Sequence, residues 1–105
     1  MKFGLSENTI DKINNLFVKY PQIEEVILYG SRAKGNYKNG SDIDIVLKGK
    51  NMDQSFLYKL ANEIDDLMLP YSFDISLYDS ITNKELLDHI NRVGKVFFNR
   101  SLITN

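Results

Sequence analysis

The sequence contains no cysteine, only two prolines and no long hydrophobic run. Without cysteine, the chain can form neither disulfides nor cysteine-ligated zinc sites, and a reducing compartment is the simplest setting for it. The first ten residues, "MKFGLSENTI", lack the apolar core of a signal peptide. No run approaches the roughly 20 apolar residues of a membrane span. We therefore expect a cytoplasmic protein that does not associate with membranes.

A basic excess is also missing. The chain has 13 Lys and Arg against 14 Asp and Glu, a formal net charge of −1. Proteins that bind the phosphate backbone of nucleic acids in general usually carry a strong positive excess, so this function is not expected. A nucleotide remains a suitable ligand, because one small anion needs only a few local cations.

Neither repeats, low-complexity segments nor Pro- and Gly-rich linkers interrupt the chain. With 105 residues, 43% of them hydrophobic and 26% charged, the composition is that of an ordinary globular protein. This length fits one domain and leaves no room for two. We expect a single domain over residues 1–105.

The spacing of hydrophobic residues predicts three amphipathic helices: residues 6–20, 51–69 and 82–93. Alternating or β-rich apolar runs predict three strands and one short extended segment: residues 24–30, 41–49, 71–79 and 94–99. The order α-β-β-α-β-α is typical of a small α/β (α+β) domain. We expect a mixed sheet with helices packed mainly on one face.

Polar residues and prolines mark where the predicted helices begin and end. Ser6, Asn51 and Thr82 are the expected N-caps, because their side chains can accept a hydrogen bond from the first helical turn. Pro21 and Pro70 end the first two helices, since proline disfavours the helical conformation of the residue before it.

Aspartates occupy alternate positions in two of the predicted strands. Side chains alternate across a strand, so Asp42 and Asp44 share one face while their apolar neighbours share the other. Asp74 has the same parity in the third strand. If the apolar faces pack against the helices, the three carboxylates lie on the open face. The competing interpretation is a solvated edge strand with surface acids, but aspartate is depleted in strands.

Three neighbouring carboxylates repel one another unless a cation lies between them. Mg²⁺ prefers oxygen ligands and usually keeps sites open for waters and substrate phosphates. Two such ions can activate an attacking oxygen and stabilise a leaving one. Asp42, Asp44 and Asp74 are therefore candidate magnesium ligands, with two ions expected.

A Gly-Ser turn precedes the aspartates and provides candidate phosphate contacts. Gly30 has no side chain, so backbone N–H groups there can approach a phosphate closely. The hydroxyl of Ser31 can add a hydrogen bond. Arg32 and Lys34 are the nearest cations and could neutralise phosphate charge. Together, these donors and carboxylates predict a site for phosphoryl or nucleotidyl transfer.

The complete pattern resembles the signature of the polymerase-beta-type nucleotidyltransferase superfamily. It consists of Gly30-Ser31, ten further residues, then Asp42-Ile43-Asp44, with Asp74 on a later strand. The short chain and "GSRAKG" are most similar to the minimal nucleotidyltransferases, the MNT group. The resemblance implies the nucleotidyltransferase fold, with all three aspartates binding metal and Asp74 helping to deprotonate the acceptor.

The same resemblance implies phosphate binding at Gly30 and Ser31, and ATP as the substrate. Lys34 stands where the family frequently has arginine, which is a mild departure. Larger relatives carry a helical second domain that this chain lacks. Minimal members are commonly paired with a helical HEPN protein, and the resemblance implies an antitoxin that transfers AMP to a tyrosine of that HEPN toxin. A hetero-oligomer is therefore expected, with a homodimer as the alternative.

Two other functions are compatible with the residues. In the first, the chain keeps the fold but neutralises its partner by contact alone. In the second, the nucleotide is transferred to a small molecule such as an aminoglycoside. His89, the single histidine, is interpreted as a residue of the helix surface and not as a ligand.

Overall fold

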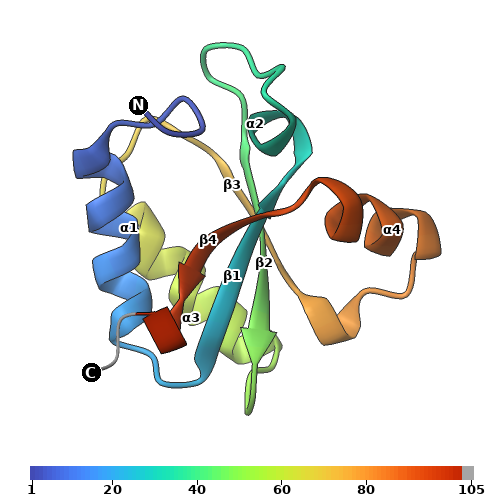
Figure 1. Ribbon diagram of the computed structural model, residues 1–105. Coiled ribbons are helices and arrows are strands. Elements are labelled where there is room, and N and C mark those ends of the chain that lie inside the picture. The colour runs from blue at the N-terminus through green and yellow to red at the C-terminus, as the bar shows by residue number, and fades with distance from the viewer. Residues whose placement is uncertain (103–105) are drawn as a thin grey trace.

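The computed structural model describes residues 1–102, in which helices pack against a mixed β-sheet (Figure 1). Its longer elements follow the chain in this order: α1 (Glu7–Val18), β1 (Ile23–Tyr29), α2 (Gly30–Lys34), β2 (Ile43–Gly49), α3 (Gln54–Asp65), β3 (Phe73–Leu77), α4 (Lys84–Val93) and β4 (Lys95–Asn99). Two 3-10 turns follow β3 and β4: η1 (Tyr78–Ser80) and η2 (Arg100–Leu102). None of the helices within residues 1–102 combines the length and apolar character needed to cross a membrane.

The four strands form one sheet in the order β3-β2-β1-β4 (Figure 1). β1 is antiparallel to both β2 and β4, whereas β2 and β3 are parallel. Parallel neighbours cannot be joined by a tight hairpin, and α3 serves as the crossover between them. This topology places the carboxyl end of β1 beside the amino ends of β2 and β3.

The main core lies between one face of the sheet and helices α1 and α3. It includes the alternate β2 residues Ile43, Ile45 and Leu47, which are at most 1% exposed. The opposite face is partly covered by α4, whose Ile90 packs in a smaller cluster with Val46, and by Tyr78 and Ile81 in the segment before that helix. The expectation that helices pack mainly on one face is thus confirmed, with α4 as the exception.

Two predicted helix caps were placed one or two residues too early. α3 is capped by Asp53, whose carboxylate accepts the Phe56 N–H, and not by Asn51. Asn51 instead adopts a left-handed conformation with φ of 59° in the preceding turn. α4 is capped by Asn83 and not by Thr82. The Ser6 cap is confirmed, because its hydroxyl accepts the Thr9 N–H.

The structure contains one helix that was not predicted, and the predicted short extended segment is a strand. Residues 30–34, predicted as turn, form the short helix α2, so Gly30 begins a helix instead of ending a strand. The extended segment near residues 94–99 is a full strand, β4, paired with β1. Both elements adjoin β1, the strand that leads into the Gly-Ser turn.

Candidate active site

Asp44 and Asp74 are direct partners across the parallel pair of strands β2 and β3. Tyr29, the last residue of β1, pairs with Asp44 from the other side. The three side chains therefore share one sheet face, opposite the one that α1 and α3 cover. The predicted alignment of Asp74 with Asp44 is present in the sheet register.

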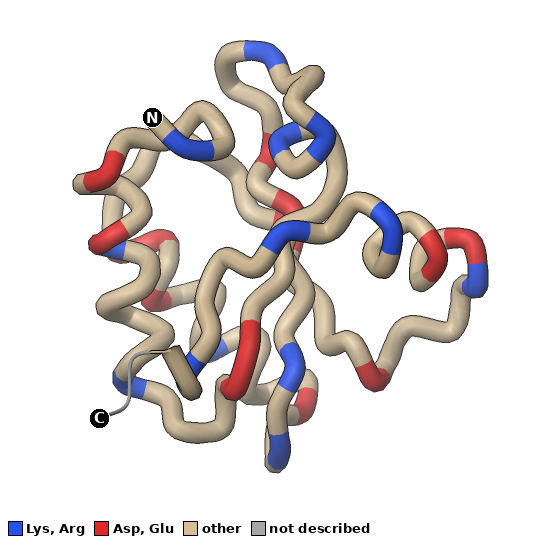
Figure 2. The backbone as a smooth tube through the Cα atoms, in the orientation of Figure 1, with Lys and Arg blue, Asp and Glu red and all other residues tan. Residues whose placement is uncertain are grey.

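Asp42 lies immediately before β2, two residues from Asp44 and on the same face by strand alternation. Its side chain is exposed, as is that of Asp74, whereas Asp44 is half-buried. Acidic positions around the start of β2 lie below the basic positions of α2 in Figure 2. Asp44 is thus the most buried of the three aspartates, while Asp42 and Asp74 face solvent.

Burial and negatively charged neighbours disfavour the ionised forms of Asp44 and Tyr29. Burial raises the pKa of Asp44, and the charges of Asp74 and then Asp42 raise it further, while His89 opposes the shift. The pKa of the Tyr29 hydroxyl is raised by burial and by the same Asp74 and Asp44 carboxylates. A hydrogen bond with Ser76 acts in the opposite direction. Asp44 thus lies in a site where negative neighbours and burial together outweigh the opposing influence of His89.

Within residues 1–102, no three side chains of His, Cys, Asp or Glu are grouped closely enough to hold a metal ion already. The donor set nevertheless fits a hard divalent cation, because it consists only of carboxylates. A bound cation would offset the repulsion that Asp44 experiences from Asp74 and Asp42. Asp42 and Asp74 are exposed and occupy the same sheet face as Asp44, so all three are available as oxygen ligands.

Gly30 provides a backbone geometry that other residues do not adopt readily. Its φ is +75°, in the left-handed region that favours glycine. A Cβ atom added at Gly30 would overlap the Asp44 carboxylate. The turn between β1 and α2 therefore lies directly against the acidic site. The absence of a side chain at position 30 is what permits this approach.

Ser31 and Lys34 lie on α2, next to this turn. Ser31 is half-buried in the first turn of the helix, and its carbonyl accepts the N–H groups of Gly35 and Asn36. Lys34 is exposed in the last turn. Both positions are compatible with the predicted phosphate contacts, which remain predictions.

Arg32 has a different environment from the one expected. Its side chain is only 3% exposed, and all three guanidinium nitrogens donate to backbone carbonyls. Nε and Nη2 bind the Ser41 carbonyl at 3.0 and 2.8 Å, and Nη1 binds that of Phe3 at 2.9 Å. The guanidinium also lies over the Tyr71 ring, 4.9 Å from its centroid. These contacts favour a structural role over phosphate binding.

His89 was interpreted as a residue of the helix surface, and that interpretation was wrong. Its side chain is partly buried, and Nε2 accepts the Gly30 N–H at 3.3 Å. The imidazole also meets the Tyr29 ring edge-on, with centroids 6.1 Å apart. The amphipathic pattern of α4 gave no sign of this contact, because the partner residue lies 59 positions away in the sequence.

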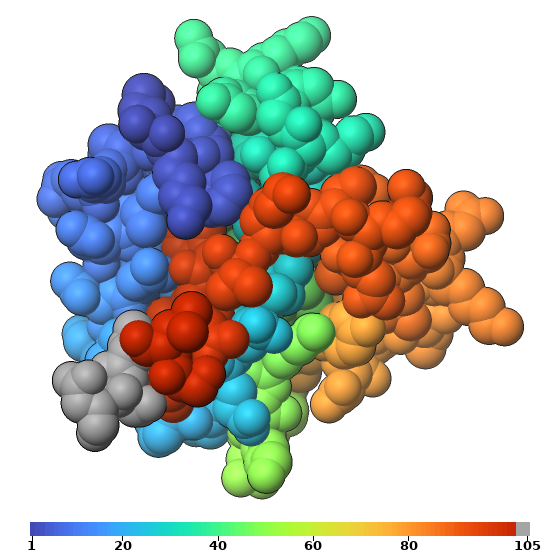
Figure 3. Space-filling view, in the orientation of Figure 1, coloured from blue at the N-terminus to red at the C-terminus, as the bar shows by residue number. Residues whose placement is uncertain are grey.

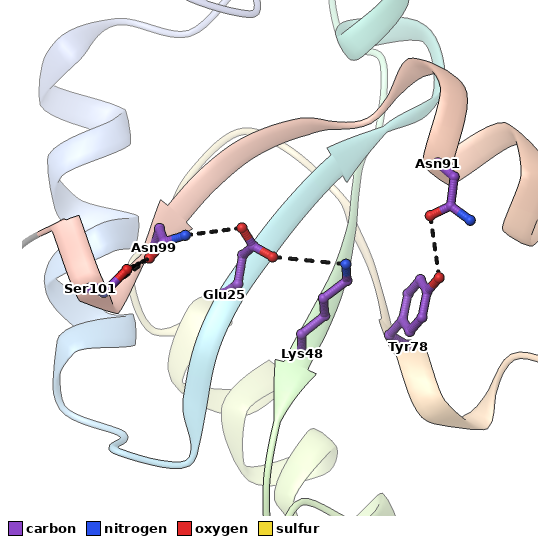
Figure 4. A network of polar contacts seen from close by, with 6 residues as sticks. All are labelled: Glu25, Lys48, Tyr78, Asn91, Asn99 and Ser101. Carbon is purple, nitrogen blue, oxygen red and sulfur yellow. Dashed lines mark hydrogen bonds and ion pairs between the residues drawn. The ribbon is translucent and has the colours of Figure 1, made fainter.

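A separate polar network occupies the other end of the open sheet face. Glu25 binds Lys48 at 3.8 Å and accepts from Asn99 at 3.0 Å (Figure 4). An open hollow of about 490 Å³ is lined there by Glu24, Glu25, Lys48, Asn99, Arg100 and Ser101. Glu25 lies four residues before Tyr29 on β1, and none of the three aspartates lines this hollow. Its size alone does not make it the reactive site, because the clustered carboxylates lie elsewhere.

A comparison with protein families identifies the family of the chain. The family described as "Polymerase beta, Nucleotidyltransferase" matches residues 11–102, nearly the whole chain. The chain belongs to this nucleotidyltransferase family. The match spans α2, β2 and β3, the elements that carry the glycine turn and the aspartates. No curated protein is significantly similar to the chain.

Solved structures with the same fold include chains from toxin–antitoxin complexes. One chain, from a toxin–antitoxin complex crystallised with AMP-PNP, has a TM-score of 0.70 and 24% identity, covering 93% of this chain and 77% of that one. A chain of the MntA–HepT complex has a TM-score of 0.68 and 19% identity, with coverage of 92% and 75%. A third, from the tri-AMPylated Shewanella oneidensis HEPN toxin with its MNT antitoxin, has the same score and identity, with coverage of 93% and 76%.

Proposed function

We propose that this nucleotidyltransferase transfers AMP from ATP to a tyrosine hydroxyl of a HEPN-type partner, in a magnesium-dependent reaction. The observation that carries the proposal is the register of the sheet. It sets Asp44 beside Asp74 and places both next to the turn at Gly30. This arrangement places a group of carboxylates that suits a metal ion next to a backbone turn without a side chain, which a phosphate group could approach.

Asp42, Asp44 and Asp74 would hold Mg²⁺, with two ions expected. Bound there, the metal would neutralise charge on the triphosphate and lower the barrier to displacement at phosphorus. The carboxylate repulsion at Asp44 supports this assignment, because it makes the metal-free site unfavourable and gives a cation a site of strong attraction. The resemblance of the motif to the family supports the same three ligands.

Gly30, Ser31 and Lys34 would contact the phosphates of ATP. Ser31 offers a hydroxyl and Lys34 an exposed positive charge on the helix that follows the glycine turn. Arg32 is omitted from this set, because its guanidinium is already engaged by backbone carbonyls. The related complex that was crystallised with AMP-PNP supports ATP as the nucleotide.

In the proposed reaction, the acceptor hydroxyl oxygen attacks the α-phosphorus of ATP. The bond between the α-phosphorus and its bridging oxygen breaks, and pyrophosphate leaves with the bonding electrons. Asp74 accepts the hydroxyl proton, as its exposed carboxylate at the open end of the site permits. The product is a phosphodiester between AMP and the acceptor side chain.

A HEPN-type protein is the proposed partner. One related structure holds a tri-AMPylated HEPN toxin in complex with its MNT antitoxin, and another is the MntA–HepT toxin–antitoxin complex. On this chain, Asp74 and Asp42 are exposed on a sheet face that α4 covers only in part. An acceptor side chain can therefore reach the carboxylates directly from solvent. We place the reaction in the cytoplasm, where ATP is available.

The test is label transfer from α-labelled ATP, in the presence of magnesium, to a HEPN-type toxin and to the product of the gene adjacent to that of this chain. Wild-type protein should add AMP to a tyrosine, with the modified residue located by mass spectrometry. Asp42→Asn combined with Asp44→Asn should reduce transfer at least 100-fold while still binding the partner. Undiminished label transfer by the double variant would show that these carboxylates are not catalytic.

The same experiment separates the two other functions. If the double variant silences the partner as fully as the wild type, the chain acts by contact and not by catalysis. If label appears on aminoglycosides or other small hydroxyl compounds but never on the protein, the acceptor is a small molecule. Both results would contradict the proposed transfer to tyrosine.

A further inference from the structure

One histidine joins α4 to the glycine turn of the active site. His89 projects from α4, the helix on the open sheet face, and its Nε2 accepts the Gly30 N–H at 3.3 Å. The space-filling view shows α4 against the segment that carries the glycine turn and α2 (Figure 3). This bond connects the turn to α4, in addition to the Arg32 contacts that connect α2 to Ser41 before β2.

The imidazole also contacts Tyr29, the last residue of β1. Its ring packs edge-on against Tyr29 at an interplanar angle of 82°. His89 therefore contacts both sides of the junction between β1 and α2: the end of the strand and the glycine turn.

The hydrogen bond helps to fix the conformation of Gly30, at the junction of β1 and α2. Glycine populates both halves of φ space about equally, so the sequence alone does not hold Gly30 at φ +75°. A different φ at Gly30 would redirect Ser31 and the whole of α2 relative to Asp44. Nε2 is the acceptor of this bond, so the imidazole lies where it holds the Gly30 peptide.

We infer that His89 is a positioning residue of the nucleotide site. It holds the Gly30 peptide so that Ser31 and the first turn of α2 face the phosphates at a constant distance from Asp44. This inference rests on the proposed function, since it assigns the glycine turn to the triphosphate. His89 makes no contact with the phosphates in this role, because its acceptor is used by the Gly30 N–H.

The alternative is that His89 competes with the nucleotide for that N–H. One N–H group donates well to only one acceptor, so a phosphate that took it would have to displace the imidazole. The two roles predict opposite changes in nucleotide affinity when the side chain is removed. Loss of a positioning residue weakens nucleotide binding, whereas loss of a competitor strengthens it.

The test compares His89→Ala, His89→Gln and the wild type by calorimetric binding of AMP-PNP with magnesium. His89→Ala should raise the Kd about ten-fold, the effect of one lost hydrogen bond. His89→Gln should stay within about three-fold, because its amide oxygen can reach the same N–H. Asn91→Ala is the matched control: it removes a side-chain hydrogen bond of α4, to Tyr78, without touching the site.

Two results would overturn the positioning role. One is equal or tighter nucleotide binding by His89→Ala, and the other is an equal loss in His89→Ala and His89→Gln. Amide exchange of Gly30 in the nucleotide-free protein gives a second, independent readout. It should be faster in His89→Ala than in the wild type or Asn91→Ala, and an unchanged rate would contradict the contact itself.

Failure of the proposed function would look different. In that case the wild-type protein would bind no AMP-PNP and transfer no AMP, and both proposals would fail together. If the wild type binds and transfers while His89→Ala does so equally well, only the positioning role is wrong.

Discussion

Asp44 combines burial with two negatively charged neighbours, and the consequence is a carboxylate that is easier to protonate than an ordinary one. In the folded protein its pKa is raised above the usual value of 3.8. The folded state therefore binds this proton more tightly than the unfolded state does. The stabilisation is fully present below pH 3.8 and is lost as the pH rises through the raised pKa.

Replacement of Asp44 by asparagine tests this directly. At neutral pH and without metal, Asp44→Asn should have a higher Tm than the wild type, because the variant removes an uncompensated charge. The difference should shrink as the pH approaches 3.8, where the wild-type carboxyl is also neutral. Thermal melts at a series of pH values measure it. A Tm difference that does not depend on pH would contradict the electrostatic explanation.

Magnesium should reverse this order. If Asp44 is a ligand, added Mg²⁺ raises the Tm of the wild type by mass action and leaves that of Asp44→Asn nearly unchanged. Melts with and without the ion, in the same buffer, supply the comparison. An equal gain for both proteins would place the ion elsewhere.

Gly30 and Gly35 form a matched pair of glycines at the two ends of α2. Both have positive φ, of 75° and 87°, so alanine at either position costs about 1–2 kcal/mol of backbone strain. Only at Gly30 would the new Cβ meet the Asp44 carboxylate, whereas nothing lies within 4 Å at Gly35. We expect Gly30→Ala to abolish nucleotide transfer and Gly35→Ala to retain it. Denaturant titration and a transfer assay on both variants separate strain from the clash.

The short helix α2 carries two basic residues with separate tasks. Arg32 connects the helix to the N-terminal segment through Phe3 and to the start of β2 through Ser41. Arg32→Lys should lower the free energy of unfolding by about 3 kcal/mol, because a lysine cannot reproduce the planar set of donors and leaves buried carbonyls unpaired. Denaturant titration measures the loss.

Lys34 provides the contrast on the same helix. Its side chain is exposed, so Lys34→Ala should change stability by no more than about 0.5 kcal/mol while weakening the binding of AMP-PNP. If Arg32→Lys instead weakened nucleotide binding without a loss of stability, the structural role given to Arg32 would be wrong.

Sequence patterns predicted the long elements well and the short ones poorly. The periodicity of α1 and α3 covers three turns each, and that length makes a helical pattern recognisable. α2 has five residues and ends at Gly35, so its sequence has the composition of a turn. The cap of α3 was misplaced because Asn51 and Asp53 are both good capping residues, and only the backbone shows which one precedes the helix.

For the site, the alternation of residues within β2 and β3 was enough to place the aspartates on one face. The order of the strands was not deducible, since residues 42–47 and 73–77 could have paired with other strands and kept the same alternation. The roles of Arg32 and His89 depend on partners distant in the sequence, Phe3 and Gly30, and no local pattern reports them. Contacts between residues so far apart in the sequence can be identified only from the folded structure.

Across the whole molecule, the parallel register of β2 and β3 determines whether the site exists. Asp44 faces Asp74, and the next residues on the same face, Val46 and Ser76, face each other. Exchanging Asp74 and Ser76 (Asp74→Ser with Ser76→Asp) keeps the composition and the face but moves the carboxylate two residues along the strand. We expect a folded protein with transfer lost, measured by circular dichroism and the label assay. Retained transfer would show that the site does not need this register.

Because β2 and β3 are joined through α3 and not by a hairpin, the two halves of the acidic pair are synthesised well apart in time. A ribosome-bound chain that ends before residue 73 already contains the glycine turn and Asp44, yet it lacks the strand that brings the second carboxylate alongside. Such an intermediate could not carry out the proposed chemistry. If the proposed function holds, nucleotide transfer requires the β2–β3 pair, which forms only after α3 and β3 have been synthesised.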